Sequence, residues 1–274
     1  MFDGKYGFFD WKYSIAGYSG QDYDGMGRYI FLIASLVLLP LLAVIFRKAK
    51  HEKIRVYLAV VGIFLTALYI AKTVWESYFD ITIGGGFNFS ILPFDTCSLI
   101  MPAAIIAGFA KGKVKQAADA WLATGGIVGG ISNLLFLQAL KYYPFWTFGA
   151  FYSMIWHFLM VFTGVLMIVT NYVKLDFKTV LYAFIFHMAF SVVVIPIDYI
   201  RDVDFMLYRY AGGAPLIEKL GETMAAQNMH WVTTIVMIIA YFGCFCLITY
   251  FSLGVKKLVH LIQSKAHNRK AKQE

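Results

Sequence analysis

The sequence predicts an all-α protein that crosses a membrane seven times, and three observations lead to this fold class. Of the 274 residues, 60% are apolar and only 15% are charged, whereas a soluble domain carries about 25% charged residues. Seven stretches are apolar over the length that a helix needs to cross the hydrocarbon core, about 20 residues. Basic and acidic residues alternate between the loops that join these stretches. A soluble domain is therefore excluded, and an aromatic content of 18% excludes a disordered chain.

The seven apolar runs are the expected membrane spans. They are residues 29–46, 54–78, 92–110, 116–140, 148–171, 180–200 and 231–258. The third begins beside Pro93, and proline suits the first turn of a helix because no backbone N–H is needed there. The fourth contains four glycines between residues 125 and 130, whose spacing allows a neighbouring helix to approach closely. Pro196 interrupts the sixth run near its end.

The charges between the spans predict the direction of each span. Cytoplasmic loops are enriched in Lys and Arg, and 16 of the 24 basic residues follow the first, third, fifth or seventh run. This alternation predicts an N-terminus outside and a C-terminus in the cytoplasm. We expect an outer interfacial segment rich in Phe, Tyr and Trp (residues 1–28), a seven-helix membrane domain (residues 29–258) and a basic cytoplasmic tail (residues 259–274).

The formal net charge of +8 has the same origin. Basic chains often contact nucleic acid, but these cations gather where anionic lipids of the inner leaflet lie, each worth about 1 kcal/mol near that surface. We therefore expect a multi-pass protein of the plasma membrane that contacts membrane phospholipids and binds no nucleic acid.

Polar and ionisable residues inside the spans mark a candidate site, because such groups are costly in hydrocarbon. They are Lys72, Glu76, Asp95, Cys97, Asn133, Gln138, His157, His187, Asp198 and His230. With the predicted direction, all fall in the outer half of their spans except His187, which falls near mid-depth. We therefore expect a polar cavity that opens outward. Asp119 lies near the inner face instead, where Lys115 at i−4 is expected to pair with it.

Several of these residues also have a purely structural interpretation. Lys72 and Glu76 share one helix face and can simply neutralise each other. The two amides of the fourth span can make interhelical hydrogen bonds, worth about 0.6 kcal/mol each. His187 can be a core histidine, and Asp198 can mark the end of the sixth span.

Cys97 and His157 are the candidate catalytic pair. A thiolate is a nucleophile, and a nearby histidine can generate it. At 1.5 Å per residue, Cys97 lies about 6 Å and His157 roughly 13 Å into their helices, so they can share a level in the membrane. In the structural interpretation Cys97 only packs, as we expect of Cys244 and Cys246. No His or Cys pair has the spacing of metal ligands, so neither metal nor cofactor is expected.

The stretch around Cys97, residues 92–99 (LPFDTCSL), resembles the LP-x-x-x-C signature of the YwaF-like integral membrane proteins. Trp75, the glycine-rich fourth span, residues 151–161 around His157, and residues 204–221 are similar in order and spacing. The resemblance covers residues 75–253, most of the predicted membrane domain. The chain departs from the commoner pattern at Asp95, where the family has His or Gln.

The resemblance implies acyl chemistry. The YwaF-like family is related to a eukaryotic membrane acyltransferase that moves fatty acyl chains between phospholipids through a cysteine and a histidine. It is also similar in architecture to androgen-induced-gene-type membrane hydrolases, which use threonine and histidine. For this chain the resemblance implies Cys97 as the acyl-accepting nucleophile and His157 as the general base.

The leading hypothesis is therefore a lipid acyltransferase or acyl hydrolase with a thioester intermediate on Cys97, and the other eight residues of the polar cavity bind the substrate. Hydrogen bonds to the oxyanion would come from Asn133, Gln138 or His230. The lipid head group would meet Lys72, Glu76 and Asp198. The alternative is a transporter or binding protein for a small polar or lipidic solute, because buried Lys, Asp and His can also bind ions or relay protons. A third possibility is a non-catalytic partner subunit.

Overall fold

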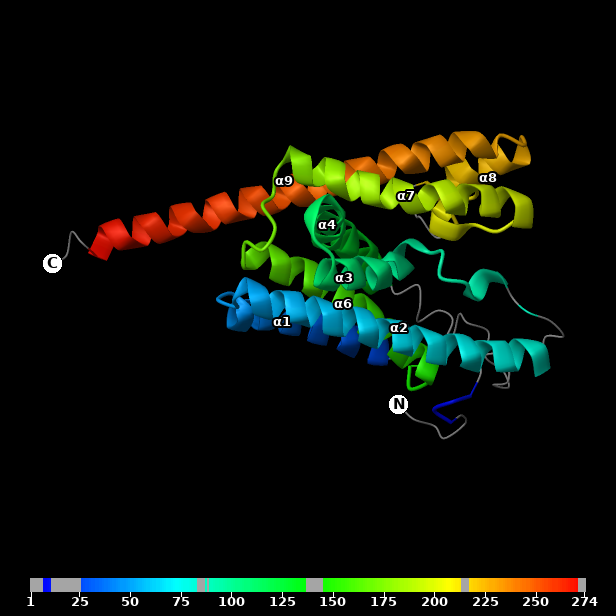
Figure 1. Cartoon of the computed structure of the whole chain (residues 1–274), viewed down its shortest axis with the longest axis horizontal. Coiled ribbons are helices and arrows are strands. Elements are labelled where there is room, and N and C mark those ends of the chain that lie inside the picture. The colour runs from blue at the N-terminus through cyan, green and yellow to red at the C-terminus, as the bar shows by residue number, and fades with distance from the viewer. Residues whose placement is uncertain are drawn as a thin grey trace.

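Figure 1 shows the computed structural model of the chain, which describes residues 7–10, 26–82, 87, 89–136, 145–212 and 217–270. Its α-helices are α1 (Met26–Phe46), α2 (His51–Thr82), α3 (Ile100–Phe109), α4 (Gly112–Phe136), α6 (Phe148–Val169), α7 (Phe177–Arg201), α8 (Glu218–Ala226) and α9 (His230–Lys270). Three short 3-10 helices are η2 (Phe89–Ile91), η3 (Thr96–Leu99) and η4 (Phe205–Leu207). The described ranges contain no β-strand, so the all-α prediction is confirmed for them.

Six segments within the described ranges are long and apolar enough to cross a membrane. They are Tyr29–Phe46, His51–Phe79, Phe89–Phe109, Phe148–Val169, Phe177–Arg201 and His230–Lys265. Each coincides with a span expected from the sequence, so the chain is a multi-pass membrane protein. Large apolar side chains remain exposed along these helices, as the lipid-facing surface of a bundle requires.

The fourth expected span is residues 116–140, of which residues 116–136 lie in helix α4 and the rest lie outside the described residues. Helix α4 is not one of these six segments. Its first turns carry Lys113, Lys115 and Asp119, which lower its mean hydropathy. Helix α4 lies in the middle of the bundle (Figure 1) and contacts α3, α6, α7 and α9. All but one of residues 117–127 are buried. Because protein rather than lipid surrounds this helix, it does not need the apolar surface by which spans are recognised.

Two helix contacts depend on glycine. A Cβ atom on Gly108 of α3 would lie 2.7 Å from the Cα atom of Ala59 on α2. A Cβ atom on Gly130 of α4 would lie 2.5 Å from a methyl carbon of Val161 on α6. Both distances are too short for a side chain, so the close approach predicted from the glycines of the fourth span is confirmed.

The connections gather at two opposite ends of the bundle. At one end, which we call the basic end, Lys115 donates to the hydroxyl of Tyr172 across 2.9 Å. The ring of Tyr172 lies 5.2 Å from that of His51, and Arg55 donates to the carbonyl oxygen of Gly108 across 2.8 Å. The start of α2, the end of α3, the start of α4 and the end of α6 therefore meet there. The expected ion pair of Lys115 with Asp119 forms at 2.5 Å.

At the opposite end, the chain near the N-terminus meets the start of α6. The backbone N–H of Phe148 donates to the carbonyl oxygen of Phe8 across 2.6 Å. The guanidinium of Arg201, which ends α7, lies 3.8 Å from the centre of the Phe89 ring. The loops that the charges predict on opposite sides of the membrane thus lie at opposite ends of the bundle.

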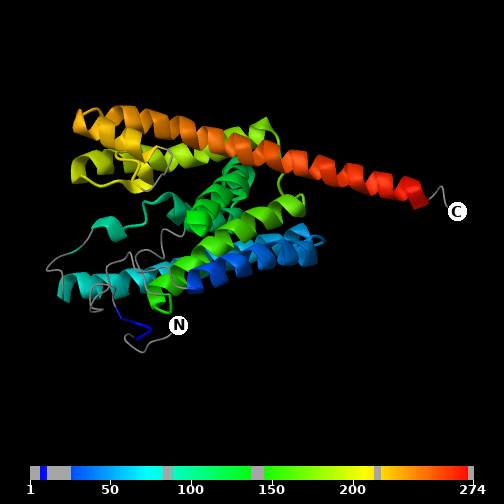
Figure 2. The same ribbon diagram turned by 180° about the vertical axis from the view of Figure 1, so that it is seen from behind.

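Helix α9 continues beyond the rest of the bundle at the basic end, as Figures 1 and 2 show from front and back. Lys256 of this helix donates to the side-chain oxygen of Asn171 across 2.7 Å, which places its second half at the basic end. The boundary expected at residue 258 between membrane domain and tail falls inside this continuous helix.

Candidate functional site

Cys97 lies in η3, the 3-10 turn that precedes α3. The sequence predicts Cys97 one turn inside an α-helix, whereas the α-helix begins only at Ile100. The difference arises at Asp95, whose extended backbone (ψ 152°) separates Pro93 from the turn. The carbonyl oxygen of Cys97 accepts a hydrogen bond from the indole N–H of Trp156 on α6, at 3.1 Å. The turn that carries the thiol is thus fixed from a neighbouring helix.

Aromatic side chains and one ion pair surround this turn. Lys72 and Glu76 on α2 form an ion pair, as their spacing predicts, and the side chain of Glu76 is only 3% exposed. The ammonium of Lys72 lies 5.6 Å from the centre of the Tyr152 ring. Trp156 packs between two tyrosine rings, with centroid distances of 5.1 Å to Tyr152 and 6.0 Å to Tyr69.

Cys97 and Asp95 belong to the same cluster. Both lie within electrostatic reach of the Lys72 ammonium. Asp95 is exposed and Cys97 is half-buried, so molecules outside the protein can reach this part of the surface. The structure therefore brings together four of the ten residues predicted for the site: Lys72, Glu76, Asp95 and Cys97.

His157 is buried on α6, one residue after Trp156. Its Nδ1 atom lies 2.7 Å from the backbone carbonyl oxygen of Ser153 and 3.2 Å from the hydroxyl of the same residue. A carbonyl oxygen can only accept, so Nδ1 carries the proton in this arrangement and Nε2 carries the lone pair. This tautomer is the one that a general base requires.

Cys97 and His157 lie on elements that touch, but in the described residues they make no hydrogen bond to each other. Trp156 is the link, because its side chain binds the backbone of Cys97 and its own backbone continues into His157. The structure therefore places the two residues on neighbouring elements that Trp156 connects.

His187 lies in a separate buried network at the interface of α7 and α9. Its Nε2 atom is 3.1 Å from the hydroxyl of Tyr208, and its ring lies 4.2 Å from that of Tyr241. Tyr241 donates to the carbonyl oxygen of Met206 across 2.8 Å and lies 2.7 Å from the hydroxyl of Thr96. These contacts favour the interpretation of His187 as a core residue, and they connect its network to the turn that holds Cys97.

Asp198 organises the connection between α7 and α8. Its carboxylate accepts the N–H of Phe205 across 2.8 Å, while the Asp204 carboxylate accepts the N–H groups of Arg209 and Tyr210 at 2.8 and 2.9 Å. Asp198 is fully buried. It therefore holds a loop rather than joining the cluster around Lys72.

The same loop packs inward against the region of Cys97. Phe205, Met206 and Tyr208 are buried, and the Phe205 ring lies 5.4 Å from that of Phe94. Met206 adopts a positive φ of 52°, a strained conformation for a residue with a side chain. Burial raises the pKa of Tyr208 to about 12, so its hydroxyl remains a hydrogen-bond donor in this loop at neutral pH.

The remaining predicted residues lie elsewhere. The ring of His230, at the start of α9, has Nδ1 3.4 Å from the carbonyl oxygen of Arg209. Asn133 is half-buried on α4. Gln138 lies outside the described residues.

Sequence reasoning missed the aromatic part of the cluster around Cys97. Tyr and Trp in a predicted span are usually interpreted as interface anchors, so Tyr69, Tyr152 and Trp156 do not stand out. The available signal was the spacing of four between Tyr152 and Trp156, which puts both on the same face of α6.

Within the described ranges, no group of three or more His, Cys, Asp or Glu side chains is arranged to hold a metal ion. A model of the TMEM164 family matches residues 23–245, which include the Lys72 cluster, Cys97 and His157. No curated protein gives a match, and no solved structure does.

Proposed function

This chain belongs to the TMEM164 family, a family of multi-pass membrane proteins, and from that premise we propose that it is a membrane-embedded lipid acyltransferase or acyl hydrolase. The proposal is based on the resemblance to the YwaF-like proteins, which are related to a cysteine–histidine phospholipid acyltransferase. Cys97 is the nucleophile and His157 is the general base.

The observation that carries the proposal is the hydrogen bond of His157 Nδ1 to the carbonyl oxygen of Ser153 at 2.7 Å. It leaves the Nε2 lone pair free to take a proton. The hydrogen bond from Trp156 to Cys97 supports the proposal further, because it joins the turn that carries the nucleophile to the helix that carries the base.

The reaction has two steps. In the first, Cys97 loses its proton to His157 Nε2, and its sulfur attacks the ester carbonyl of a lipid. The bond from the carbonyl carbon to the alkoxy oxygen breaks, and the leaving alcohol takes the proton from His157. In the second, the hydroxyl of an acceptor, or water, gives its proton to His157 and attacks the thioester. The C–S bond then breaks and the thiolate recovers the proton.

In this mechanism Lys72 binds the substrate. Its charge acts on both Cys97 and Asp95, and an ammonium attracts the phosphate of a lipid head group. Glu76 holds Lys72 in place through the ion pair along α2.

The direction in the membrane belongs to the same proposal: seven crossings of the plasma membrane, an outer N-terminus and a cytoplasmic basic end. The chain enters α4 at the basic end, where Lys115 binds Tyr172, and enters α6 at the opposite end, where Phe148 binds Phe8. Between the start of α4 and the start of α6, the chain therefore passes from one end of the bundle to the other. This passage supports a seventh crossing. The site around Cys97 then faces the outer leaflet.

Intact-protein mass spectrometry after incubation with phospholipid vesicles tests the proposal. We expect a mass gain of one acyl chain that hydroxylamine removes, present in the wild type and absent in Cys97→Ala. Cys246→Ala is the matched control, since Cys246 is another half-buried cysteine, on α9, and its loss should leave the adduct intact. An adduct that survives Cys97→Ala, or a wild type that never forms one with any phospholipid class, contradicts the mechanism.

A further inference from the structure

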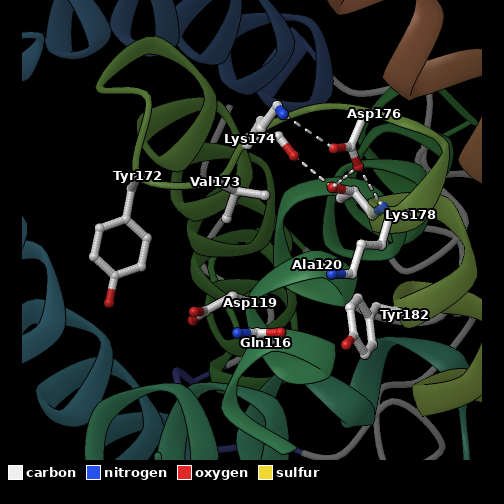
Figure 3. Close-up of a pocket in the computed structure, with 10 residues that line it drawn as sticks. Gln116, Asp119, Ala120, Tyr172, Val173, Lys174, Asp176, Lys178 and Tyr182 are labelled. Atoms are coloured by element: carbon white, nitrogen blue, oxygen red, sulfur yellow. Dashed lines mark hydrogen bonds and ion pairs between the residues drawn. The ribbon is translucent and has the colours of Figure 1, made fainter. Parts of the chain in front are cut away.

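A pocket of ≈ 350 Å³ lies at the basic end of the bundle, and Cys97 is not part of its lining. Its walls come from the start of α4, the connection from α6 to α7 and the first turns of α7. We call it the basal pocket. Its polar lining includes Gln116, Asp119, Tyr172, Lys174, Lys178 and Tyr182 (Figure 3). None of the residues proposed for catalysis lines it.

One wall of the basal pocket provides a hydrogen-bond acceptor. Lys115 donates to Oδ2 of Asp119 across 2.5 Å and to the hydroxyl of Tyr172 across 2.9 Å. The other carboxylate oxygen of Asp119, Oδ1, is buried and has no hydrogen-bond partner among the described residues. A buried acceptor without a donor is costly, so this carboxylate is suited to a ligand that brings a hydroxyl group.

The other wall provides two cations. The ammonium of Lys178 lies 5.6 Å from the centre of the Tyr182 ring, and both side chains stand on the side of the pocket opposite Tyr172 in Figure 3. Lys174 is 89% exposed, and its ion pair with Asp176 is long, at 3.8 Å. An exposed ion pair of this kind is weak, so Lys174 can leave Asp176 and bind an anion at a small cost in free energy.

The start of α7 fixes the acidic residue that lies beside these two lysines. Asp176 caps the helix by accepting the N–H of Thr179 across 2.9 Å, so its carboxylate is held by the helix N-terminus as well as by Lys174. The two walls differ in character, because the cations lie on the α7 side and the unpaired acceptor lies on the α4 side.

We propose that the basal pocket binds a phosphorylated polyol. Lys174 and Lys178 hold the phosphoryl oxygens, and Asp119 accepts a hydrogen bond from a neighbouring hydroxyl of the same ligand. A bare anion does not suit the α4 side, because the Asp119 carboxylate repels it. A purely apolar ligand would offer no hydrogen bond to the lysines or to the buried oxygen. The phosphorylated polyol is supplied either as a free phosphate ester or as the head group of a phospholipid.

Two arms of one binding experiment on the full-length protein separate these sources. In the first, sn-glycerol 3-phosphate is titrated into the detergent-solubilised protein by calorimetry. In the second, the protein is ejected from nanodiscs of phosphatidylcholine with and without phosphatidylglycerol, and retained lipid is identified by native mass spectrometry. Lys178→Gln and Asp119→Asn are the test variants. Lys257→Gln is the control, because it removes one exposed lysine from α9, outside the pocket.

We expect binding in at least one arm, weakened about tenfold or more by Lys178→Gln, since a charge-assisted hydrogen bond of about 1.5–3 kcal/mol corresponds to that factor. Lys257→Gln should leave binding unchanged, and acyl-adduct formation at Cys97 should persist in every variant. The proposal is overturned by no binding in either arm, or by equal loss in Lys178→Gln and Lys257→Gln. Either result leaves the proposed acyl chemistry intact, because that reaction is measured separately.

Discussion

Trp156 donates its indole N–H to the carbonyl oxygen of Cys97 across 3.1 Å, and the residue that follows it along α6 is His157. One hydrogen bond between two helical elements therefore sets the position of the proposed nucleophile relative to the proposed base. The connection runs from the backbone of Cys97 through the side chain of Trp156 to the backbone of His157.

Trp156→Phe removes this hydrogen bond and keeps an aromatic ring. We expect the rate of acyl-adduct formation at Cys97 to fall and the stability to drop by about 1–3 kcal/mol, because the carbonyl of Cys97 loses its donor. Trp121→Phe is the matched control: Trp121 is fully buried, and its Nε1 has no hydrogen-bond partner within the described residues. Time-resolved intact mass measures the rate. Equal slowing in both variants would show that lost volume, not the hydrogen bond, is responsible.

Lys72→Met removes the cation beside a nearly fully buried carboxylate. We expect a loss of about 3–5 kcal/mol in the free energy of unfolding, because the buried side chain of Glu76 loses its ion pair with Lys72. Lys72→Met combined with Glu76→Gln should recover most of that loss. Unfolding by denaturant in detergent measures both. If the double variant is as unstable as the single one, the ion pair is not the reason for the loss.

Asp176 makes the stability of the basic end depend on pH. The backbone N–H of Thr179 lowers the pKa of Asp176 below its usual value of 3.8. The charged cap therefore contributes its full stability above about pH 4, and the contribution is lost as the pH falls through the lower pKa of the folded state. Asp176→Ala should cost about 1 kcal/mol at neutral pH, and this difference should shrink in acid. Asp176→Asn keeps a capping oxygen that does not titrate, so thermal unfolding of this variant should lack the acid-dependent loss.

Gly130→Ala tests the close contact of α4 with α6. The new methyl group would lie 2.5 Å from Val161 and 3.0 Å from the carbonyl oxygen of His157, so we expect a destabilisation of about 1–3 kcal/mol. Gly243→Ala on α9 is the control, since no atom lies within 4 Å of its added methyl group. It should be neutral or stabilise the helix by up to about 1 kcal/mol. Thermal unfolding of the two variants compares them directly, and equal midpoints would exclude the steric argument.

The sequence predicts those features that depend on composition and on spacing within one helix. Six spans, the Lys72–Glu76 and Lys115–Asp119 ion pairs, and the packing role of the glycines in α4 are of this kind. Each arises from neighbours three or four residues apart, or from the contrast between apolar side chains and water, and both signals are local in the chain.

The features that the sequence did not predict depend on contacts between distant residues. Tyr241 binds Met206 and Thr96, which lie 35 and 145 residues away from it. The central position of α4 also cannot be predicted from the sequence. Hydropathy measures how favourably a segment transfers into lipid, and it does not tell which helix the others enclose. The 3-10 turn at Cys97 depends in the same way on a side chain from α6.

The enclosed position of α4 has a consequence for how the protein is made. Helix α4 emerges from the ribosome before α6, α7 and α9, which supply most of its surroundings. Its charged first turns and its many glycines give it little gain from entering lipid alone. We therefore expect α4 to take its place only together with the later helices, and a nascent chain halted before α6 to hold it loosely.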